Sequence, residues 1–245
     1  MTIKKHIPNF ITLLNLASGC VAIILLSQYD YQTAPRNIEY AFYFVCLGIF
    51  LDFFDGFFAR LFNVTGELGL QLDSLADMVT SGVAPGFAMY LLLADAENVA
   101  EFGSFFPFLG FIITLGSAYR LAKFNIDTRQ TTSFIGLPTP ANALFIMSLL
   151  VIKLTSDSLI VLEILINPYF LLVVTALSAY MLNAEIPLFS LKVKSPSFAK
   201  NKLQILFLLF SAALILLLGF AGVPIVILSY VALSVILNKS KRADV

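Results

Sequence analysis

Four aspartates in two neighbouring apolar segments are the residues of this sequence best suited to chemistry. Asp52 and Asp55 lie three residues apart in the first segment. Asp73 and Asp77 lie four residues apart in the second. Each spacing puts both carboxylates on one face of a helix. Because a carboxylate within a membrane span is costly and usually has a function, we expect the four acids to form one site.

A divalent cation would neutralise such a group of acids. Arg60 is the only cation near them in the sequence, and one guanidinium cannot balance four carboxylates. A site made of oxygen ligands alone, without His or Cys, suits Mg²⁺, Mn²⁺ or Ca²⁺. The alternative is a packing face with a structural cluster of ion pairs, but intramembrane acids without a function are rare.

Small residues accompany the acids on the same helix faces. Gly56 and Ala59 lie in the first segment, just after the first acidic pair. Gly69 lies in the second segment, one turn before Asp73. Small side chains let helices approach closely, or they leave space for a bulky ligand. We therefore expect close packing or open space beside the carboxylates.

These residues resemble the signature of the CDP-alcohol phosphotransferase family. All eight signature positions are filled at the family's spacing, as Asp52-x-x-Asp55-Gly56-x-x-Ala59-Arg60, eight residues, then Gly69-x-x-x-Asp73-x-x-x-Asp77. The resemblance implies a fold of six core membrane helices, a homodimer, and two metal ions, Mg²⁺ or Mn²⁺, between the four aspartates. It also implies a CDP-linked donor whose diphosphate meets the metals, an alcohol acceptor, and release of CMP.

The resemblance also implies a role for each signature residue. Asp77 resembles the base that takes the proton of the acceptor hydroxyl, and all four aspartates resemble metal ligands. The sequence does not separate these two roles for Asp77. Arg60 is expected to donate charge-assisted hydrogen bonds to the phosphates of the donor, CDP-diacylglycerol. The other residues expected to contact this donor are Thr12, Gly56, Ala59 and Gly69.

Further segments resemble the membrane-bound phosphatidylserine synthases, which join CDP-diacylglycerol to L-serine. They are Pro8–Leu16, Arg120–Asn125, Phe134–Ala141 and Ile186–Lys192. Arg120 and Lys123 are expected to receive the carboxylate of serine, and Asn125 its amino group. The alternative is that Arg120 and Lys123 are ordinary anchors at the cytoplasmic end of a span. Ser81 departs from the resemblance, because those synthases more often have Phe at this position, which could line the acceptor pocket.

The composition is that of a membrane protein. Of the 245 residues, 59% are hydrophobic and 12% are charged, whereas soluble domains have about 25% charged residues. Since a spanning helix needs about 20 apolar residues, we predict an all-α integral membrane protein with eight spans, near 8–28, 39–62, 69–93, 103–126, 138–156, 165–183, 203–220 and 223–238. Residues 8–28 are expected to stay as the first span rather than to be removed as a signal peptide.

The resemblance divides the chain into two parts. Residues 1–192 would form the six-helix CDP-alcohol phosphotransferase core. Residues 193–245 would add two C-terminal transmembrane helices and a basic tail.

The distribution of Lys and Arg predicts the orientation. With a cytoplasmic N-terminus, thirteen of the fifteen Lys and Arg residues fall on the inner side, and only Arg36 and Lys153 fall on the outer side. This asymmetry follows the positive-inside rule. We therefore expect a protein of the cytoplasmic membrane, in contact with membrane lipid, with both termini and the active site on the cytoplasmic side. We expect no nucleic-acid partner.

Three functions are compatible with the sequence. The first is the transfer of a phosphatidyl group to L-serine. The second is another CDP-alcohol transfer, by a phosphatidylglycerophosphate or inositol-phosphate lipid synthase, whose phosphorylated acceptors should need more cations than Arg120, Lys123 and Arg129. The third is transport of a divalent cation, which should need acids along the whole membrane pathway, whereas these acids stop near one face.

Overall fold

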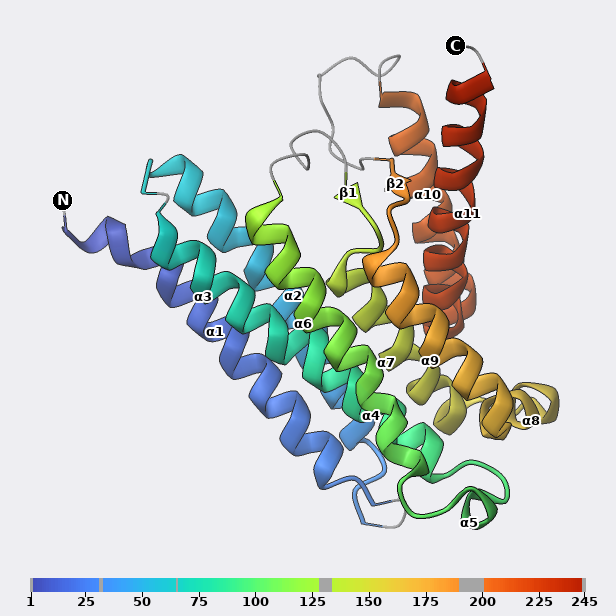
Figure 1. Cartoon of the computed structure of the whole chain (residues 1–245). Coiled ribbons are helices and arrows are strands. Elements are labelled where there is room, and N and C mark those ends of the chain that lie inside the picture. The colour runs from blue at the N-terminus through green and yellow to red at the C-terminus, as the bar shows by residue number, and fades with distance from the viewer. Residues whose placement is uncertain (1, 31–32, 65, 128–133, 190–200, 244–245) are drawn as a thin grey trace.

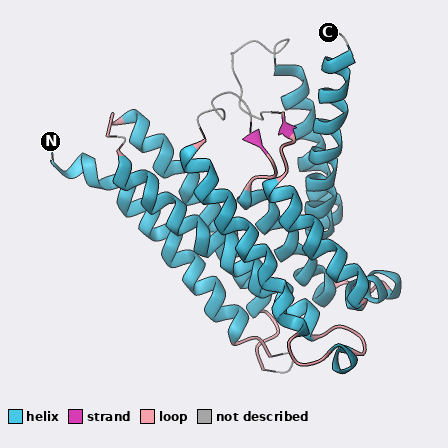
Figure 2. Cartoon of the chain, in the orientation of Figure 1, coloured by secondary structure: helices cyan, strands magenta, loops and turns pink. Residues whose placement is uncertain are grey.

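The computed structural model describes residues 2–30, 33–64, 66–127, 134–189 and 201–243 (Figure 1). Most of them lie in helices (Figure 2). The α-helices are α1 (Thr2–Ser27), α2 (Asn37–Leu61), α3 (Glu67–Asp77), α4 (Ala84–Ala94), α5 (Val99–Phe102), α6 (Ile112–Ile126), α7 (Thr139–Thr155), α8 (Leu159–Ile166), α9 (Pro168–Asn183), α10 (Lys202–Leu218) and α11 (Gly222–Ala243). The 3₁₀ segments η2 (Phe106–Phe111) and η4 (Gly219–Ala221) lead into α6 and α11. The predicted all-α membrane fold is confirmed.

One short antiparallel strand pair fixes the segment before α7 against the segment after α9. In this pair, β1 (Phe134–Ile135) lies beside β2 (Pro187–Leu188). The next residue, Gly136, has a φ of 75°, and a Cβ added there would lie 2.7 Å from the carbonyl oxygen of Leu182. Only glycine tolerates both conditions. The chain before α7 therefore packs tightly on the carboxyl end of α9.

Four helical stretches of the described residues are long and apolar enough to cross a membrane, or five if the bent pair α8 and α9 counts as one. They are His6–Ser27, Asn37–Leu61, Glu67–Ala94 and Lys202–Leu237. The last stretch is interrupted at Gly219, with a φ of 56°, and α10 and α11 pack side by side (Figure 1). Other helices are short for a span of about 20 residues, since α6 has 15 residues and α7 has 17. The number of eight spans stays a prediction.

The third of these stretches changes its helical geometry next to an acid. Together α3, η1 (Met78–Val83) and α4 form one helix of 28 residues, and η1 is a π-helix. A π-helical turn is rare and occurs frequently at functional sites. Asp77 is the last residue of α3, directly before this turn.

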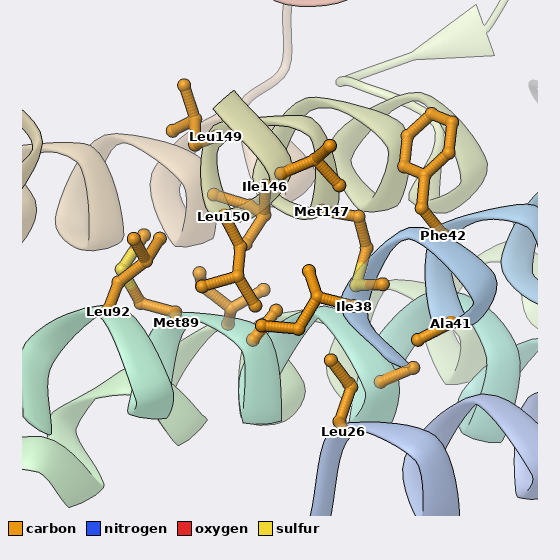
Figure 3. Packing of buried hydrophobic residues seen from close by; sticks show 14 of the residues in the cluster. Leu26, Ile38, Ala41, Phe42, Met89, Leu92, Ile146, Met147, Leu149 and Leu150 are labelled. Atoms are coloured by element: carbon orange, nitrogen blue, oxygen red, sulfur yellow. The ribbon is translucent and has the colours of Figure 1, made fainter. Parts of the chain in front are cut away.

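Apolar packing joins the helices at some distance along the chain from the aspartates. Buried side chains of α1, α2, α4 and α7 form one cluster (Figure 3), which includes Leu26, Ile38, Ala41, Phe42, Met89, Leu92, Ile146, Met147, Leu149 and Leu150. These residues belong to the end of α1, the start of α2, the later turns of α4 and the middle of α7. Asp52 and Asp55 lie in the second half of α2, and Asp73 and Asp77 lie in α3, the first part of the stretch Glu67–Ala94. The main apolar core therefore supports the acidic site without surrounding it.

Both termini lie at one end of the molecule, together with the turn from α2 to α3, whereas α5 and α8 lie at the other (Figure 1). At the far end, Lys153 Nζ pairs with Asp95 Oδ2 at 3.1 Å. The predicted division between residues 192 and 193 lies outside the described residues, and so does Arg129.

Candidate active site

Three carboxylates meet where the second half of α2 approaches α3. Oxygen atoms of Asp52, Asp55 and Asp73 all lie within 4.8 Å of one another. The connection between the helices is short, since α2 ends at Leu61 and α3 begins at Glu67. The structure thus brings together three of the four acids that the sequence singled out.

The fourth acid, Asp77, lies one helical turn beyond Asp73 and is buried. It lines the same cavity as Asp52 and Asp73. Its Oδ1 accepts a hydrogen bond of 3.3 Å from Asn15 Nδ2 on α1. Asp77 therefore faces the acidic group and is held there by a different helix.

Thr12 of α1 holds a second carboxylate. Its Oγ1 lies 2.6 Å from Asp55 Oδ2 and 3.1 Å from the carbonyl oxygen of Pro8. The hydroxyl has one proton to donate, and the shorter distance to the carboxylate is typical of a charge-assisted bond. Thr12 was predicted to contact the donor lipid, and the structure gives it a direct contact with Asp55.

Two polar residues of this network, Asn15 and Thr80, were not assigned to the site from the sequence. Thr80 Oγ1 lies 2.9 Å from Asn15 Oδ1, and Asn15 in turn contacts Asp77. A sequence signal for Asn15 exists, because Thr12 and Asn15 are the polar residues, three apart, within the otherwise apolar stretch Phe10–Leu16 of α1. No comparable periodic signal marks Thr80.

A cavity of about 180 Å³ opens beside the acids between α1, α2 and α3. Its lining includes four of the predicted donor contacts, and we call it the glycine cavity: Pro8, Asn9, Thr12, Asp55, Gly56, Ala59, Val64, Gly66, Gly69, Leu70 and Asp73. The fifth predicted donor contact, Arg60, is exposed, and its guanidinium lies close to Gly56, where an added Cβ would be 3.4 Å from Arg60 Nη1. Since no large side chain occupies the position of Gly56 or Gly69, the space next to the carboxylates stays open.

A second cavity, of about 210 Å³, also opens beside the acids. We call it the arginine cavity, and its lining residues are Asp52, Asp73, Ser74, Asp77, Arg120, Leu121, Phe124, Pro138, Thr139 and Pro140. Asp73 lines both cavities. A group bound in one cavity can therefore meet a group bound in the other at Asp73.

Arg120 is a buried cation, with 7% of its surface exposed. Its Nη1 donates to the carbonyl oxygens of Ile135, at 2.9 Å, and Leu182, at 2.8 Å. The Leu182 carbonyl is also the one that Gly136 approaches closely. No carboxylate of the described residues forms an ion pair with Arg120. A buried cation without a counter-ion is costly, so the Arg120 side of this cavity suits an anionic group, whereas the side lined by Asp52, Asp73 and Asp77 suits a cation.

The other two residues predicted to bind serine lie farther from this cavity. Lys123 Nζ pairs with Glu185 Oε1 at 3.4 Å and is not among the lining residues. Asn125 does not line the cavity either, but its Nδ2 donates to Ser74 Oγ at 2.9 Å, and Ser74 does. Ser81 is fully buried in η1 and lines neither cavity. Of these residues, the structure brings only Arg120 directly to the acids.

The acidic group has the chemistry of a divalent-cation site. Among the described residues, no Lys or Arg forms an ion pair with Asp52, Asp55, Asp73 or Asp77. The Oδ1 atom of Asp73 is buried and has no hydrogen-bond partner among the described residues. Closely spaced carboxylate oxygens with an unused acceptor fit a hard cation that prefers oxygen ligands.

Comparison with known proteins identifies the family. A sequence model described as CDP-alcohol phosphatidyltransferase matches residues 5–180. The chain belongs to the CDP-alcohol phosphatidyltransferase family. The match includes the four aspartates, both cavities and Arg120, whereas α10 and α11 lie beyond it. As a CDP-alcohol phosphatidyltransferase, the protein is a membrane enzyme of phospholipid biosynthesis.

Its relatives include several enzymes named for transfer to serine. The chain is 33% identical over 201 residues to a CDP-diacylglycerol–serine O-phosphatidyltransferase of Bacillus subtilis, covering 80% of this chain and 93% of that protein. An enzyme of the same name from Saccharomyces cerevisiae is 32% identical over 153 residues, and the match spans 59% of this chain and only 53% of the yeast protein. An archaetidylserine synthase of Methanothermobacter thermautotrophicus is 29% identical over 147 residues, 58% of this chain and 56% of that protein.

Proposed function

We propose that this enzyme transfers the phosphatidyl group of CDP-diacylglycerol to the hydroxyl of L-serine, giving phosphatidylserine and CMP. One observation carries the proposal: Asp73 lines two cavities, and only the second contains the buried cation Arg120, which forms no ion pair with any described residue. Two substrates that react at the acids would occupy these two cavities. The names of the relatives are consistent with this pair of substrates.

The donor would occupy the glycine cavity. Gly56, Ala59 and Gly69 leave space there for a bulky ligand. Arg60, close to Gly56, would donate charge-assisted hydrogen bonds to the diphosphate. The diphosphate would then lie next to Asp55 and Asp73.

The acceptor would occupy the arginine cavity, with its carboxylate on Arg120. L-Serine is small, and it supplies the single negative charge that Arg120 lacks. A phosphorylated acceptor would need further cations, but Arg120 is the only Lys or Arg among the described residues that line the cavity. This difference favours serine over glycerol 3-phosphate or an inositol phosphate. Lys123 would attract the acceptor from outside the cavity. Asn125 would act on the acceptor through its hydrogen bond to Ser74.

The four aspartates would hold Mg²⁺ or Mn²⁺, two ions by the family resemblance. When bound, such ions supply positive charge to the diphosphate and to the negative charge that develops on the attacking and leaving oxygens. Asp77 faces the arginine cavity and would take the proton of the serine hydroxyl. The serine oxygen then bonds to the phosphorus that carries diacylglycerol. The bond from this phosphorus to the bridging oxygen breaks, and CMP leaves with that oxygen.

The active site and both termini would face the cytoplasm, in a homodimer in the cytoplasmic membrane. The charge asymmetry of the sequence and the shared end of the two termini support this orientation. After Cys20 and Cys46 are replaced by Ala, a Lys4→Cys variant should react with an impermeant thiol reagent only from the cytoplasmic side, and Glu97→Cys only from outside. The reverse labelling would contradict the orientation, and a monomeric mass in active detergent solution would contradict the homodimer.

The acceptor can be tested with purified protein in detergent. With Mn²⁺, CDP-diacylglycerol and labelled L-serine, we expect labelled lipid, and excess glycerol 3-phosphate or inositol phosphate should not reduce the yield. Incorporation of labelled glycerol 3-phosphate in place of serine would refute the proposal while leaving the family unchanged.

A further inference from the structure

Thr80 and Asn15 lie directly behind Asp77, and both residues are fully buried. Thr80 Oγ1 lies 2.9 Å from Asn15 Oδ1 and 3.1 Å from the main-chain oxygen of Asn15. Because both of these oxygens can only accept, the Thr80 hydroxyl must be the donor. Thr80 therefore holds the main chain of α1 and the side chain of Asn15 at the same point.

The orientation of the Asn15 amide follows from this contact. With Oδ1 facing Thr80, the Nδ2 atom of Asn15 faces Asp77 Oδ1 at 3.3 Å. An ionised carboxylate can only accept hydrogen bonds. An amide turned the other way would place two oxygens against each other at Asp77 and would leave the Thr80 hydroxyl facing an N–H group. The acceptor-only carboxylate of Asp77 thus selects the Nδ2 end of the amide, and the Thr80 hydroxyl stabilises this orientation by donating to the opposite end.

Two glycines make room for this arrangement. A Cβ added at Gly48 of α2 would lie 2.6 Å from Thr80 Cγ2 and 2.7 Å from Asn15 Oδ1. A Cβ added at Gly19 of α1 would collide with Thr80 Oγ1 and lie 2.9 Å from Thr80 Cα. Favourable contacts between carbon atoms are about 3.5–4.0 Å long. The three segments α1, α2 and η1 can therefore meet around Asn15 and Thr80 only with glycine at both positions.

We propose that Asn15 and Thr80 are positioning residues for Asp77, which fix one oxygen of its carboxylate and keep the carboxylate facing the arginine cavity. The proposal rests on the proposed function, in which Asp77 takes the proton of the acceptor. Proton transfer depends on a base held within hydrogen-bond reach of its substrate, and a base held by a supporting side chain keeps that geometry. The π-helical turn supplies this support, because Thr80 lies in η1 just after Asp77.

The kinetic test compares substitutions that remove the hydrogen bonds with one that keeps them. Thr80→Val and Asn15→Leu are close in size to the original residues but cannot form the contacts, whereas Thr80→Ser retains the hydroxyl. For the first two, we expect kcat to fall roughly 10- to 100-fold, while KM for both substrates changes less than about threefold. Thr80→Ser should restore most of the kcat that Thr80→Val loses.

Ser18→Ala is the matched control. Ser18 is also buried on α1, and its Oγ donates to the carbonyl oxygen of Phe44 on α2 at 2.7 Å, away from any carboxylate. The Ser18→Ala variant should keep nearly the full kcat. An equal loss in Ser18→Ala and Thr80→Val would overturn the proposal, because it would show that α1 packing alone matters. A rise in KM with kcat unchanged would also overturn the proposal.

A second measurement needs no activity. Thermal unfolding of the full chain in detergent with EDTA is compared for Asn15→Ala, Asp77→Ala and the double variant. Residues in contact give non-additive changes, and separate residues give additive ones. We expect the changes in unfolding to be non-additive for Asn15→Ala with Asp77→Ala. We expect them to be additive for Ser18→Ala with Asp77→Ala. Additive changes in both pairs would overturn the proposal. If the wild type uses an acceptor other than serine, the proposed function fails, while the unfolding test and the kcat ratios with that acceptor still decide this proposal.

Discussion

Thr12 Oγ1 of α1 donates a hydrogen bond of 2.6 Å to Oδ2 of Asp55 on α2. Both residues are buried. One turn further along α1, Asn15 donates to Asp77. A single apolar helix thus holds two of the four acids, and a hydrogen bond to a charged group is worth about 1.5–3 kcal/mol.

Replacing Thr12 by Val should therefore lower kcat/KM for CDP-diacylglycerol by roughly 10- to 100-fold, because Asp55 loses its donor beside the glycine cavity. Thr12→Ser should stay near the wild-type value. The control is Thr175→Val, which removes a buried hydroxyl that bonds only to Leu171 of its own helix, at 2.8 Å. Equal losses in the Thr12 and Thr175 variants would show that the Asp55 contact has no special role.

Enlarging the small residues of the glycine cavity should block the donor. Gly56→Leu and Ala59→Leu each place a large side chain in a cavity of about 180 Å³. We expect both to abolish binding of CDP-diacylglycerol, measured with the labelled lipid. Leu61→Ala is the control, because Leu61 is exposed and does not line the cavity. Unchanged binding in both enlarged variants would place the donor elsewhere.

The acids should be needed for metal binding and not for folding. Asp52→Asn, Asp55→Asn and Asp73→Asn should each remove activity and leave a folded protein, because each loses one charged oxygen ligand. EDTA should abolish the wild-type activity, and added Mg²⁺ or Mn²⁺ should restore it. Both the activity and the binding of Mn²⁺, followed by its electron paramagnetic resonance signal, should be measured. Full activity after EDTA treatment would exclude a metal-dependent reaction.

A substitution in the arginine cavity should change KM for serine and not KM for CDP-diacylglycerol. Arg120→Ala should raise KM for serine by about tenfold to a hundredfold, through loss of a charge-assisted bond, and leave KM for CDP-diacylglycerol nearly unchanged. Its melting temperature should also fall, because Arg120 holds the carbonyls of Ile135 and Leu182. Lys123→Ala should have a smaller effect, since Lys123 pairs with Glu185 at the surface. An increase in KM for the donor instead would assign Arg120 to the donor site.

The sequence was sufficient to group the acids, because their positions depend on local geometry. Spacings of three and four residues define one face of a helix, and only a short turn separates the two acidic helices. The convergence of Asp52, Asp55 and Asp73 follows almost directly from these spacings and the short turn. The same holds for Gly56 and Gly69, which line a cavity because they have no side chain to fill it.

Contacts between distant segments were harder to predict. Thr80 and Asn15 are 65 positions apart, and their contact depends on how η1 packs between α1 and α2. Lys123 was grouped with Arg120 because residues three apart lie near one face of a helix, but its partner Glu185 comes from the segment after α9. The number of spans is equally difficult to predict, because helices such as α6 and α7 are shorter than a regular membrane span.

The most direct test of the central claim is the release of CMP from CDP-diacylglycerol by the purified wild-type protein, measured separately with different acceptors. L-Serine, ethanolamine and glycerol 3-phosphate each offer a hydroxyl group, but only serine combines it with a single carboxylate for Arg120. We predict that L-serine gives one CMP for each molecule of phosphatidylserine formed, and that the other two acceptors give almost none. Rapid CMP release with glycerol 3-phosphate or ethanolamine, and none with L-serine, would contradict the account.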